Sequence, residues 1–561
     1  MRTSRVSNRI VVTLLCAFVV LSGCSSEKPA ETAKKEETAK KEESANTGLS
    51  TAGALPISKE KVTITITVPS SPTVLSWEYG KNELTTWLED QTNVHIKWNF
   101  YPAADAKTKL NLELSSGGDL GDLIMGNFAL DNSSLATYGS QGIIRKIEDL
   151  VDKHGVNLKK MYTEIPNIKQ ATTAPDGHIY GIPQVGICYN CDRAMRFWVN
   201  KSFLKSLNMS VPTTTDELYQ YLKAAKEKDP NGNGKKDEIG IAGSKSSWFA
   251  KADQFIMNAF TYQDSNGLYV KDDKVIAAYT TPAWRDGIRY LNKLSKEGLI
   301  DQTSFTNDEA QLKQIVELNN GNSVAAVPSG GPHAFAANDA TRMNYEIVPP
   351  LKGPGGFQTS YFNEFGIVGS YQFAIPANGK NADVVMKLVD FMYGQEAYLR
   401  SRYGVQGVNW EVPKGTLAAN GEPAKFKLVG KDLWQEPQNT HWQGANTTWP
   451  SFGSDSREVL PEGKFDLEKV LFDAAKLYDK TAGKVSIPKF FFEPKTATRF
   501  NELKTEINKK MEADIADFIV GNRDIEKDWD KFQAELKNIG NDEYVSIMQK
   551  EYDAKWKGSK K

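Results

Sequence analysis

Strand and helix patterns alternate between residues 62 and 125, and this alternation restricts the fold more than any other feature of the chain. Residues 62–68 place β-branched and small polar side chains in turn, which is the two-residue period of a half-buried strand. Four expected elements follow: a helix capped by Asn82, a strand at 94–98, a helix at 103–115 and an apolar strand at 123–125. Strands joined by helical crossovers pair in parallel, so this order predicts an α/β fold that binds ligands beyond the carboxyl ends of its strands.

The loops that follow these strands supply candidate binding residues. Trp77 follows the first strand, and Asn127 and Phe128 follow the third. Trp87 and Trp98 lie at regular positions of the expected helix and strand, and we therefore assign them to the core.

The part of the chain from about residue 55 to residue 561 is too long for a single hydrophobic core, which predicts at least two lobes. The extended run 177–183 is interpreted as a crossing between lobes, and residues 197–201 begin a second α/β unit. An α-rich segment, 496–556, is expected to pack across the second lobe.

One helix of the second unit has clear limits. Thr214 and Glu217 predict a capping box at its start. The helix must end at Lys228, because Asp229 precedes a proline and is excluded from helical backbone.

The N-terminus has the pattern of an exported chain. Three arginines precede an apolar run, residues 10–20, that is too short to span a bilayer. The tetrad Leu-Ser-Gly-Cys at 21–24 resembles the lipobox of bacterial lipoproteins, which implies cleavage before Cys24 and its acylation. The alternative is an ordinary secretory signal with a chance cysteine.

Residues 25–48 contain no aromatic and no large aliphatic side chain, and they repeat Glu-Thr-Ala-Lys-Lys-Glu. Such a segment cannot bury a core, so it predicts a disordered tether, with a helical Lys/Glu stalk as the alternative. The formal charge of the whole chain is -1, and loss of the three signal-peptide arginines makes it about -4. This charge does not favour a nucleic-acid partner.

Cys188 and Cys191 remain once Cys16 leaves with the signal peptide and Cys24 is acylated. A zinc site would need a second pair of ligands, and His178 does not stand at ligand spacing. A short-loop disulfide is favoured outside the cell, while two free thiols or a redox-active pair stay open.

The segment 229–238 has the composition of a calcium loop. Its candidate ligands are the side chains of Asp229, Asn231, Asn233, Asp237 and Glu238 and the carbonyl of Lys235, with Gly234 at the bend. It departs from the EF-hand pattern at the twelfth position, which is Gly240 in place of a glutamate. The alternative is a solvated loop rich in Asx turns. A saturated calcium ion would be structural, because catalysis needs an open coordination position.

Signatures of catalysis are missing from the sequence. It has no G-x-S-x-G, P-loop or H-E-x-x-H motif, and its five histidines are scattered. No particular carboxylate pair indicates a glycosidase. Loop aromatics are better candidates for function, since rings can bind the C–H face of a sugar, although each could also be core: Trp77, Phe128, Tyr189, Trp248, Trp410, Trp434, Trp442 and Trp449.

Several motifs resemble one family. They are Ser-Ser-Gly-Gly-Asp-Leu-Gly-Asp-Leu-Ile at 115–124, Ala-Pro-Asp-Gly-His-Ile-Tyr-Gly-Ile-Pro-Gln at 174–184, Phe-Trp-Val-Asn-Lys at 197–201, Val-Pro-Thr-Thr-Thr-Asp-Glu-Leu at 211–218, the run 290–301, Gly-Val-Gln-Gly-Val-Asn-Trp-Glu at 404–411 and Asp-Trp-Asp at 528–530. Over essentially the whole mature body the chain resembles family 1 extracellular solute-binding lipoproteins of ABC importers, including Paenibacillus-type lipoproteins and alginate-oligosaccharide binding proteins.

This resemblance implies a periplasmic-binding-protein-like fold of two hinged α/β lobes with the solute held between them. It implies the calcium ligands named above. For the solute it implies Asn127 and Phe128 on the first lobe, and Tyr189, Arg193, Arg196, Trp248 and His333 on the second. Arg193 and Arg196 would favour an acidic sugar through bidentate contacts, with solvation or pairing between the lobes as the alternative.

The predicted segments are a signal peptide (1–23), a tether (24–54), first-lobe segments (55–183 and 366–440) and second-lobe segments (184–365 and 441–561). The predicted function is that of a monomeric, lipid-anchored protein on the extracellular face of the cytoplasmic membrane. It would capture an oligosaccharide for an ABC permease and would not be an enzyme. Alternatives are the same fold binding peptides, or a polysaccharide hydrolase or lyase. A structural adhesin would usually show repeats that this chain lacks.

Overall fold

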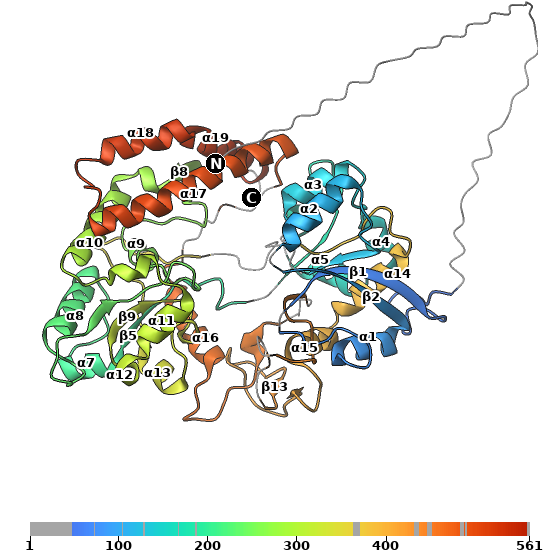
Figure 1. The fold of residues 1–561 in the computed structure, drawn as a ribbon, viewed down its shortest axis with the longest axis horizontal. Helices are drawn as coiled ribbons and strands as arrows, with labels where there is room; N and C mark the ends of the chain where they lie inside the picture. Colours follow the sequence, from blue (N-terminus) through green and yellow to red (C-terminus); the bar gives the residue numbers. More distant parts are fainter. Residues whose placement is uncertain are drawn as a thin grey trace, which may run out of the picture. The chain divides into compact units, whose positions relative to one another are not determined.

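The computed structural model describes residues 48–71, 73–103, 105–126, 130–165, 168–185, 188–362, 371–430, 433, 437–445, 452–482, 487 and 491–557. The predicted signal peptide, the lipidation site and most of the tether lie outside these residues, as do Asn127, Phe128, Trp434 and Trp449. Figure 1 labels the elements along the chain.

The first lobe is built on a five-stranded sheet. Its strands are β1 (Val62–Pro69), β2 (Val94–Tyr101), β3 (Leu123–Met125), β4 (Ile182–Pro183) and β11 (Tyr371–Ala374), in the order β2-β1-β3-β11-β4. β1 pairs in parallel with β2 and β3, whereas β11 runs antiparallel to β3 and β4. The predicted β-α-β-α-β order is confirmed. The apolar residues that alternate along β1, Ile64, Ile66 and Val68, are buried.

Helices of the first lobe follow or separate the strands of this sheet along the chain. They are α1 (Glu83–Thr92), α2 (Ala106–Ser116), α3 (Asn132–Ser140), α4 (Glu148–His154), α5 (Asn157–Glu164), α6 (Ile168–Thr172) and α14 (Ala382–Met392). α1 begins where the sequence predicts, because the Asn82 side chain accepts hydrogen bonds from the backbone N–H groups of Leu84 and Thr85.

The predicted crossing at 177–183 is wrong. Ile182 and Pro183 form an edge strand of the first-lobe sheet, paired with β11. Ile179 and Ile182 are buried in the first-lobe core, which holds this segment to the lobe. Val185 is buried in the same core, so the chain remains in the first lobe at least as far as this residue.

The second lobe has a four-stranded sheet in the order β10-β5-β9-β6. Its strands are β5 (Phe197–Asn200), β6 (Ile239–Ile241), β9 (Val324–Pro328) and β10 (Tyr345–Ile347), with a separate hairpin of β7 (Leu268–Lys271) and β8 (Lys274–Ala277). Its helices are α7 (Lys201–Leu207), α8 (Thr215–Glu227), α9 (Gln254–Met257), α10 (Pro282–Lys296), α11 (Glu309–Val316), α12 (Leu318–Gly321) and α13 (Asp339–Met343). The second α/β unit begins at Phe197, as predicted.

The limits predicted for α8 are confirmed. The Thr214 hydroxyl accepts from the N–H of Glu217, and Lys228 is the C-cap. The reciprocal half of the capping box is displaced by one residue, since the Glu217 carboxylate accepts from the N–H and hydroxyl of Thr213.

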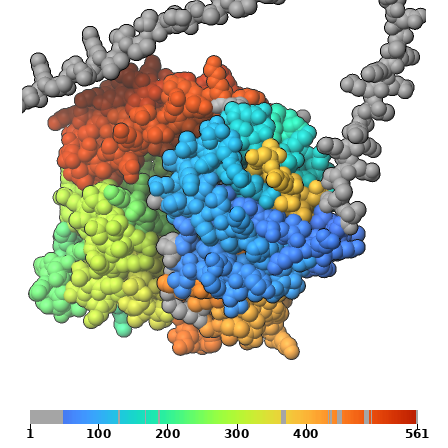
Figure 2. Space-filling view, turned by 45° about the vertical axis from the view of Figure 1, so that its right-hand side comes forward, coloured from blue at the N-terminus to red at the C-terminus, as the bar shows by residue number. Residues whose placement is uncertain are grey.

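The C-terminal helices belong to the second lobe, as expected. α16 (Leu467–Tyr478) is followed by α17 (Pro494–Val520), α18 (Trp529–Ile539) and α19 (Asn541–Lys555). Phe518, Phe532 and Tyr544 are buried in the same core as α10. Figure 2 shows the red residues of α17 to α19 lying against the green second-lobe residues. Within the described ranges, no helix combines the length and apolarity needed to cross a bilayer.

A small unit within the predicted first-lobe segment 366–440 was not expected from the sequence. It contains α15 (Gln395–Tyr403), β12 (Trp410–Glu411) and β13 (Lys427–Leu428), which pair antiparallel. Trp410 is 2% exposed in a cluster with Tyr403, Phe426 and Phe452, and its indole N–H donates to the Gly404 carbonyl. The structure thus places this predicted ligand residue in a core.

Candidate functional site

Three loops meet at one edge of the second-lobe sheet. The loop with Trp248 follows β6 and the loop with His333 follows β9, and these strands pair in parallel. The segment before β5 joins the same edge, because Phe197 pairs with Pro328 in an antiparallel register. Open α/β sheets bind ligands beyond the carboxyl ends of their strands, so this edge is the candidate site.

Ring-bearing side chains cluster near this edge in a group that we call the aromatic wall, in which Tyr361 is buried and the others are partly exposed: Tyr189, Trp248, Phe249, His333, Tyr361 and Phe362. The Trp248 ring lies 5.7 Å from the His333 ring and 6.1 Å from the Phe249 ring, centroid to centroid. Phe249 lies 5.6 Å from Tyr361. Trp248, Phe249 and His333 are partly exposed. Flat rings that remain accessible can pack against the C–H face of a sugar.

Trp248 is held in place by backbone contacts. Its carbonyl accepts the Gly330 N–H at 2.9 Å. The neighbouring Phe249 has a φ of +51°, a left-handed conformation that is strained for a bulky side chain. Strain of this kind persists where the surrounding structure enforces a particular side-chain direction.

Replacing Gly330 with alanine should disturb the wall. A Cβ atom at this position would lie 2.3 Å from the Trp248 ring, so the indole must shift. We expect a cost of about 1 to 2 kcal/mol in ligand binding at the wall or in folding, typical of overpacking. Isothermal titration and urea denaturation would measure both. Gly355→Ala, where the added Cβ meets nothing within 4 Å, is the control.

His333 offers an uncharged polar atom beside Trp248. Its Nδ1 is buried and has no hydrogen-bond partner among the residues described. Burial, helped by Arg342 and Lys313, lowers the pKa of His333 to about 4, so the imidazole is neutral at pH 7. A neutral imidazole can accept a hydrogen bond at one nitrogen and donate at the other, which suits a hydroxyl group.

Arg193 is enclosed by the wall and paired with Asp479. Its guanidinium carbon lies 4.5 Å from the Tyr189 ring centroid and 5.1 Å from that of Phe362. Its Nε lies 2.5 Å from the Asp479 carboxylate, which also accepts the Tyr189 hydroxyl. Burial and this hydrogen bond raise the pKa of Tyr189 to about 12, so the hydroxyl stays protonated at neutral pH.

Arg196 does not reach the candidate site, contrary to prediction. Its side chain is fully buried, and it donates to the backbone carbonyls of Asn190, Gly330 and Leu471. Burial lowers its pKa to about 10, which still leaves it charged. Arg196 thus ties the segment before β5 to the loop after β9 and to α16.

The segment before β5 is closed by a disulfide between Cys188 and Cys191, the pairing favoured over free thiols. The Asp192 N–H donates to the Cys188 carbonyl. Because Tyr189 lies inside this four-residue ring, the disulfide restricts one member of the aromatic wall.

Trp77 and Trp442 lie in the first-lobe core instead of lining a cleft. Trp442 is 0% exposed and Trp77 is 6% exposed, and their rings stack at 6.0 Å. The Trp442 indole N–H donates to the Thr85 hydroxyl. Trp98 packs edge-on against both rings, as its predicted core role requires. Loop position alone therefore misassigned these two tryptophans.

The predicted calcium loop is folded through its own Asx turns. The Asp229 carboxylate accepts the N–H groups of Asn233 and Gly234 at 3.1 and 2.8 Å. The Asn233 side chain accepts the Lys235 N–H at 2.8 Å and donates to Asp237 at 3.0 Å. These turns are expected both for a calcium loop and for a solvated loop, so they do not distinguish the two interpretations. Among the described residues, no three His, Cys, Asp or Glu side chains already converge as a metal cluster.

Glu238 separates the two interpretations. It is 5% exposed, and neither carboxylate oxygen makes a hydrogen bond to the described residues. Burial and the nearby Asp229 and Asp237 raise its pKa. Only the backbone N–H groups of Glu238 itself and Asn231 favour its charged form. A buried carboxylate that no cation or side-chain donor reaches is unfavourable, whereas a solvated loop has no need of one. The donor set of carboxylate, amide and carbonyl oxygens fits calcium, and magnesium less well.

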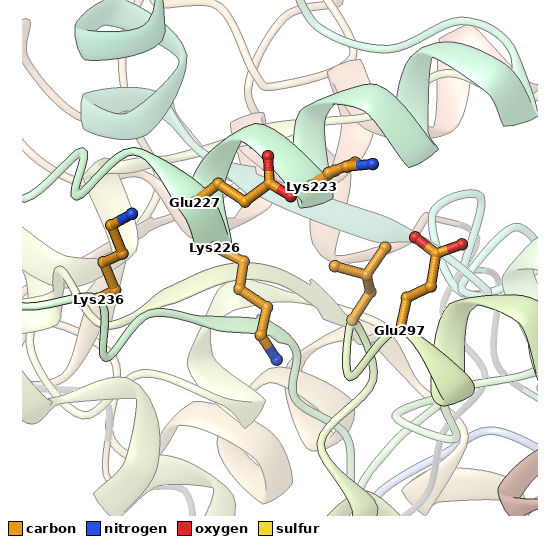
Figure 3. Close-up of a pocket in the computed structure, with 6 residues that line it drawn as sticks. Lys223, Lys226, Glu227, Lys236 and Glu297 are labelled. Carbon is orange, nitrogen blue, oxygen red and sulfur yellow. The ribbon is translucent and has the colours of Figure 1, made fainter.

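A surface pocket of about 320 Å³ lies next to this loop, lined by Lys223, Lys226, Glu227, Lys236, Glu297 and Leu299 (Figure 3). Lys226 donates to the Gly298 carbonyl, and Glu297 accepts the Tyr219 hydroxyl. The lining mixes both signs of charge and contains no aromatic ring. It is therefore a poorer sugar site than the aromatic wall.

Four residues of the site were missed. Phe249 could have been found as the neighbour of Trp248, and Tyr361 and Phe362 as consecutive aromatics shortly after the glycine-rich stretch 353–356. Asp479 had no signal in the sequence, because only the tertiary fold brings the end of α16 to Arg193.

Comparisons with known proteins agree with this architecture. Residues 74–398 match the family described as bacterial extracellular solute-binding protein. Over 516 residues the chain is 29% identical to the fructooligosaccharide ABC transporter substrate-binding protein FusA of Streptococcus pneumoniae serotype 4, covering 88% of this chain and 91% of FusA. It is 25% identical over 366 residues to the polygalacturonan/rhamnogalacturonan-binding protein YtcQ of Bacillus subtilis strain 168. The match covers 61% of this chain and 68% of YtcQ. A solved structure of a FusA EF-hand mutant with fructo-nystose is 26% identical, with a TM-score of 0.72 and coverage of 88% and 99%. The chain belongs to the family of bacterial extracellular solute-binding proteins.

Proposed function

We propose that this chain is the oligosaccharide-binding component of an ABC importer. The observation that carries the proposal is the aromatic wall, whose partly exposed rings and neutral imidazole suit the apolar faces and hydroxyl groups of sugars. FusA and YtcQ, both named for saccharides, support a sugar over a peptide. Their names include both uncharged and acidic saccharides, so they leave the charge of the solute open.

The proposed role is capture and delivery without chemical conversion. A solute that contacts both lobes would favour the closed state, and the permease would recognise that state. The relatives named above are described as binding proteins, which supports a role other than catalysis.

A calcium ion would stabilise the second lobe. Its ligands would be Asp229, Asn231, Asn233, the Lys235 carbonyl, Asp237 and Glu238. The buried, unpaired carboxylate of Glu238 supports this proposal, and the EF-hand named in the FusA structure is consistent with it. The ion would neutralise the buried Glu238 carboxylate, which has no other cation beside it among the described residues. Its role would be structural and not catalytic.

The chain would act as a monomer held at the extracellular face of the cytoplasmic membrane. The lipobox-like tetrad ending at Cys24 supports a lipid anchor, and the charged repeat of residues 25–48 supports a tether between membrane and lobes.

A thermal-shift screen tests the function. Residues 48–561 form one compact unit suited to this screen. Uncharged oligosaccharides, acidic oligosaccharides and peptides would be compared with and without a calcium chelator. A ligand at a hundredfold its Kd adds about 2.7 kcal/mol to the free energy of unfolding. Stabilisation by sugars supports the proposal, and stabilisation by peptides alone contradicts it.

A further inference from the structure

The charges around the aromatic wall distinguish between uncharged and acidic oligosaccharides. A protein that selects a uronate carboxylate presents it with a guanidinium or ammonium group free to pair. Whether the wall has such a cation therefore decides the class of sugar it can select. Cations with contacts at or near the wall include Arg193, Arg196, Lys313, Arg342 and Lys476.

Arg193 is already neutralised. Its Nε is 2.5 Å from the Asp479 carboxylate, its Nη1 is 4.0 Å from the Asp192 carboxylate, and its side chain is only 15% exposed. Tyr189 and Phe362 flank its guanidinium, and its Nη1 donates to the Tyr189 carbonyl. The Asp479 side chain is 40% exposed and is the accessible half of the pair. An incoming carboxylate would meet this aspartate before it reached the arginine.

The other cations are engaged as well. Arg196 is fully buried and bound by backbone carbonyls. Near His333, Lys313 pairs with Glu309 at 2.7 Å and Arg342 pairs with Asp339 at 2.9 Å.

Lys476 also lies near the wall. Its ammonium group is 4.6 Å from the centroid of Phe472, whose ring packs against Tyr189. Lys476 is exposed on α16, where water and salt screen its charge. It therefore adds little selectivity for an acidic sugar.

We infer that the aromatic wall selects uncharged oligosaccharides, and that Asp479 determines this selectivity by neutralising Arg193. The inference rests on the proposed function and specifies its solute class. It reverses the expectation that Arg193 and Arg196 recruit an acidic sugar. Asp479 acts through its charge, while its acceptor oxygen also orients Tyr189.

Asp479→Asn tests the inference, because asparagine keeps an acceptor for the Tyr189 hydroxyl and removes the charge. Isothermal titration would compare kestose, nystose and galactotriose with trigalacturonate. In the unmodified protein at least one uncharged sugar should bind roughly tenfold tighter than trigalacturonate. The substitution should make trigalacturonate bind more tightly, and so reduce the ratio of the two Kd values (trigalacturonate over the best uncharged sugar) by roughly tenfold. Raising NaCl should remove the gain, since it is electrostatic.

Three further variants make the result specific. Asp473→Asn removes the same charge from the same helix, where Asp473 pairs with Lys469, and should leave the ratio unchanged. Asp479→Glu should retain the original ratio. Arg193→Gln in the Asp479→Asn background should abolish the gain.

The outcomes separate the two proposals. Trigalacturonate binding as tight as the best uncharged sugar in the unmodified protein would overturn the inference and leave the function standing. An Asp479→Asn ratio equal to that of the unmodified protein would remove Asp479 as the determinant. If no sugar in either class bound the folded protein, the proposed function would fail, and the inference with it.

Discussion

Replacing Trp248 with alanine is expected to weaken oligosaccharide binding by roughly 30- to 150-fold. This corresponds to about 2 to 3 kcal/mol, typical of a tryptophan at the centre of an interface. Trp248 contacts both His333 and Phe249, and its carbonyl is fixed by Gly330, so its ring is held against two other members of the aromatic wall. Isothermal titration with the best uncharged sugar would measure the change.

Two controls bear on this prediction. Trp248→Phe keeps a flat ring and should lose less affinity than the alanine variant. Trp87→Ala removes a tryptophan that stacks on Phe391 in the first lobe, and it should lower stability without altering Kd. Equal affinities for Trp248→Ala and the unmodified protein would show that the sugar binds elsewhere.

Removal of calcium is expected to lower the free energy of unfolding of the second lobe by about 2.7 to 4.1 kcal/mol. These values correspond to calcium at a hundredfold and a thousandfold its Kd.

The contribution of Glu238 to the free energy of unfolding should change sign when the metal is removed. With calcium, Glu238→Gln should be less stable than the unmodified protein, because a metal ligand is lost. With chelator, it should be the more stable of the two at neutral pH, since it removes an uncompensated buried charge.

The pH dependence in chelator follows from the raised pKa of Glu238. The folded state binds the proton of the Glu238 carboxyl group more tightly than the unfolded chain does, because the pKa of this glutamate is near 4.5 when the chain is unfolded. The contribution of Glu238 to stability is therefore present below pH 4.5 and is lost as pH rises through the folded pKa. The advantage of Glu238→Gln should grow over that same window.

Urea denaturation at several pH values would measure this difference. Glu227→Gln, at an exposed glutamate at the end of α8, should give no such reversal. A Glu238 variant that behaved alike in calcium and in chelator would favour the solvated-loop interpretation.

Local patterns in the sequence predicted much of the fold. The caps of α1 and α8 and the strands around β1 follow from side-chain period and capping chemistry, which act over a few residues. The assignment of 177–183 failed because an edge strand and an extended crossing have the same local pattern. Only the pairing of Ile182 with β11 distinguishes them.

The candidate site was harder to predict than the fold. Trp77 and Trp442 stand in loops like Trp248, yet they pack on each other and on Trp98 across long sequence separations. Likewise, the sequence presents Arg193 and Arg196 as free cations, because their partners lie far along the chain: Asp479 for the first, and the carbonyls of Gly330 and Leu471 for the second. Composition and spacing carry no information on such pairings.

The proposed function requires that this protein bind an oligosaccharide and release it unchanged. The most direct measurement is isothermal titration of the calcium-loaded protein with the sugar that gives the largest thermal shift, followed by mass analysis of the recovered sugar. We expect saturable binding of one sugar per chain, with the sugar recovered intact. Recovery of shortened or unsaturated products, or saturable binding of peptides but of no sugar, would contradict it.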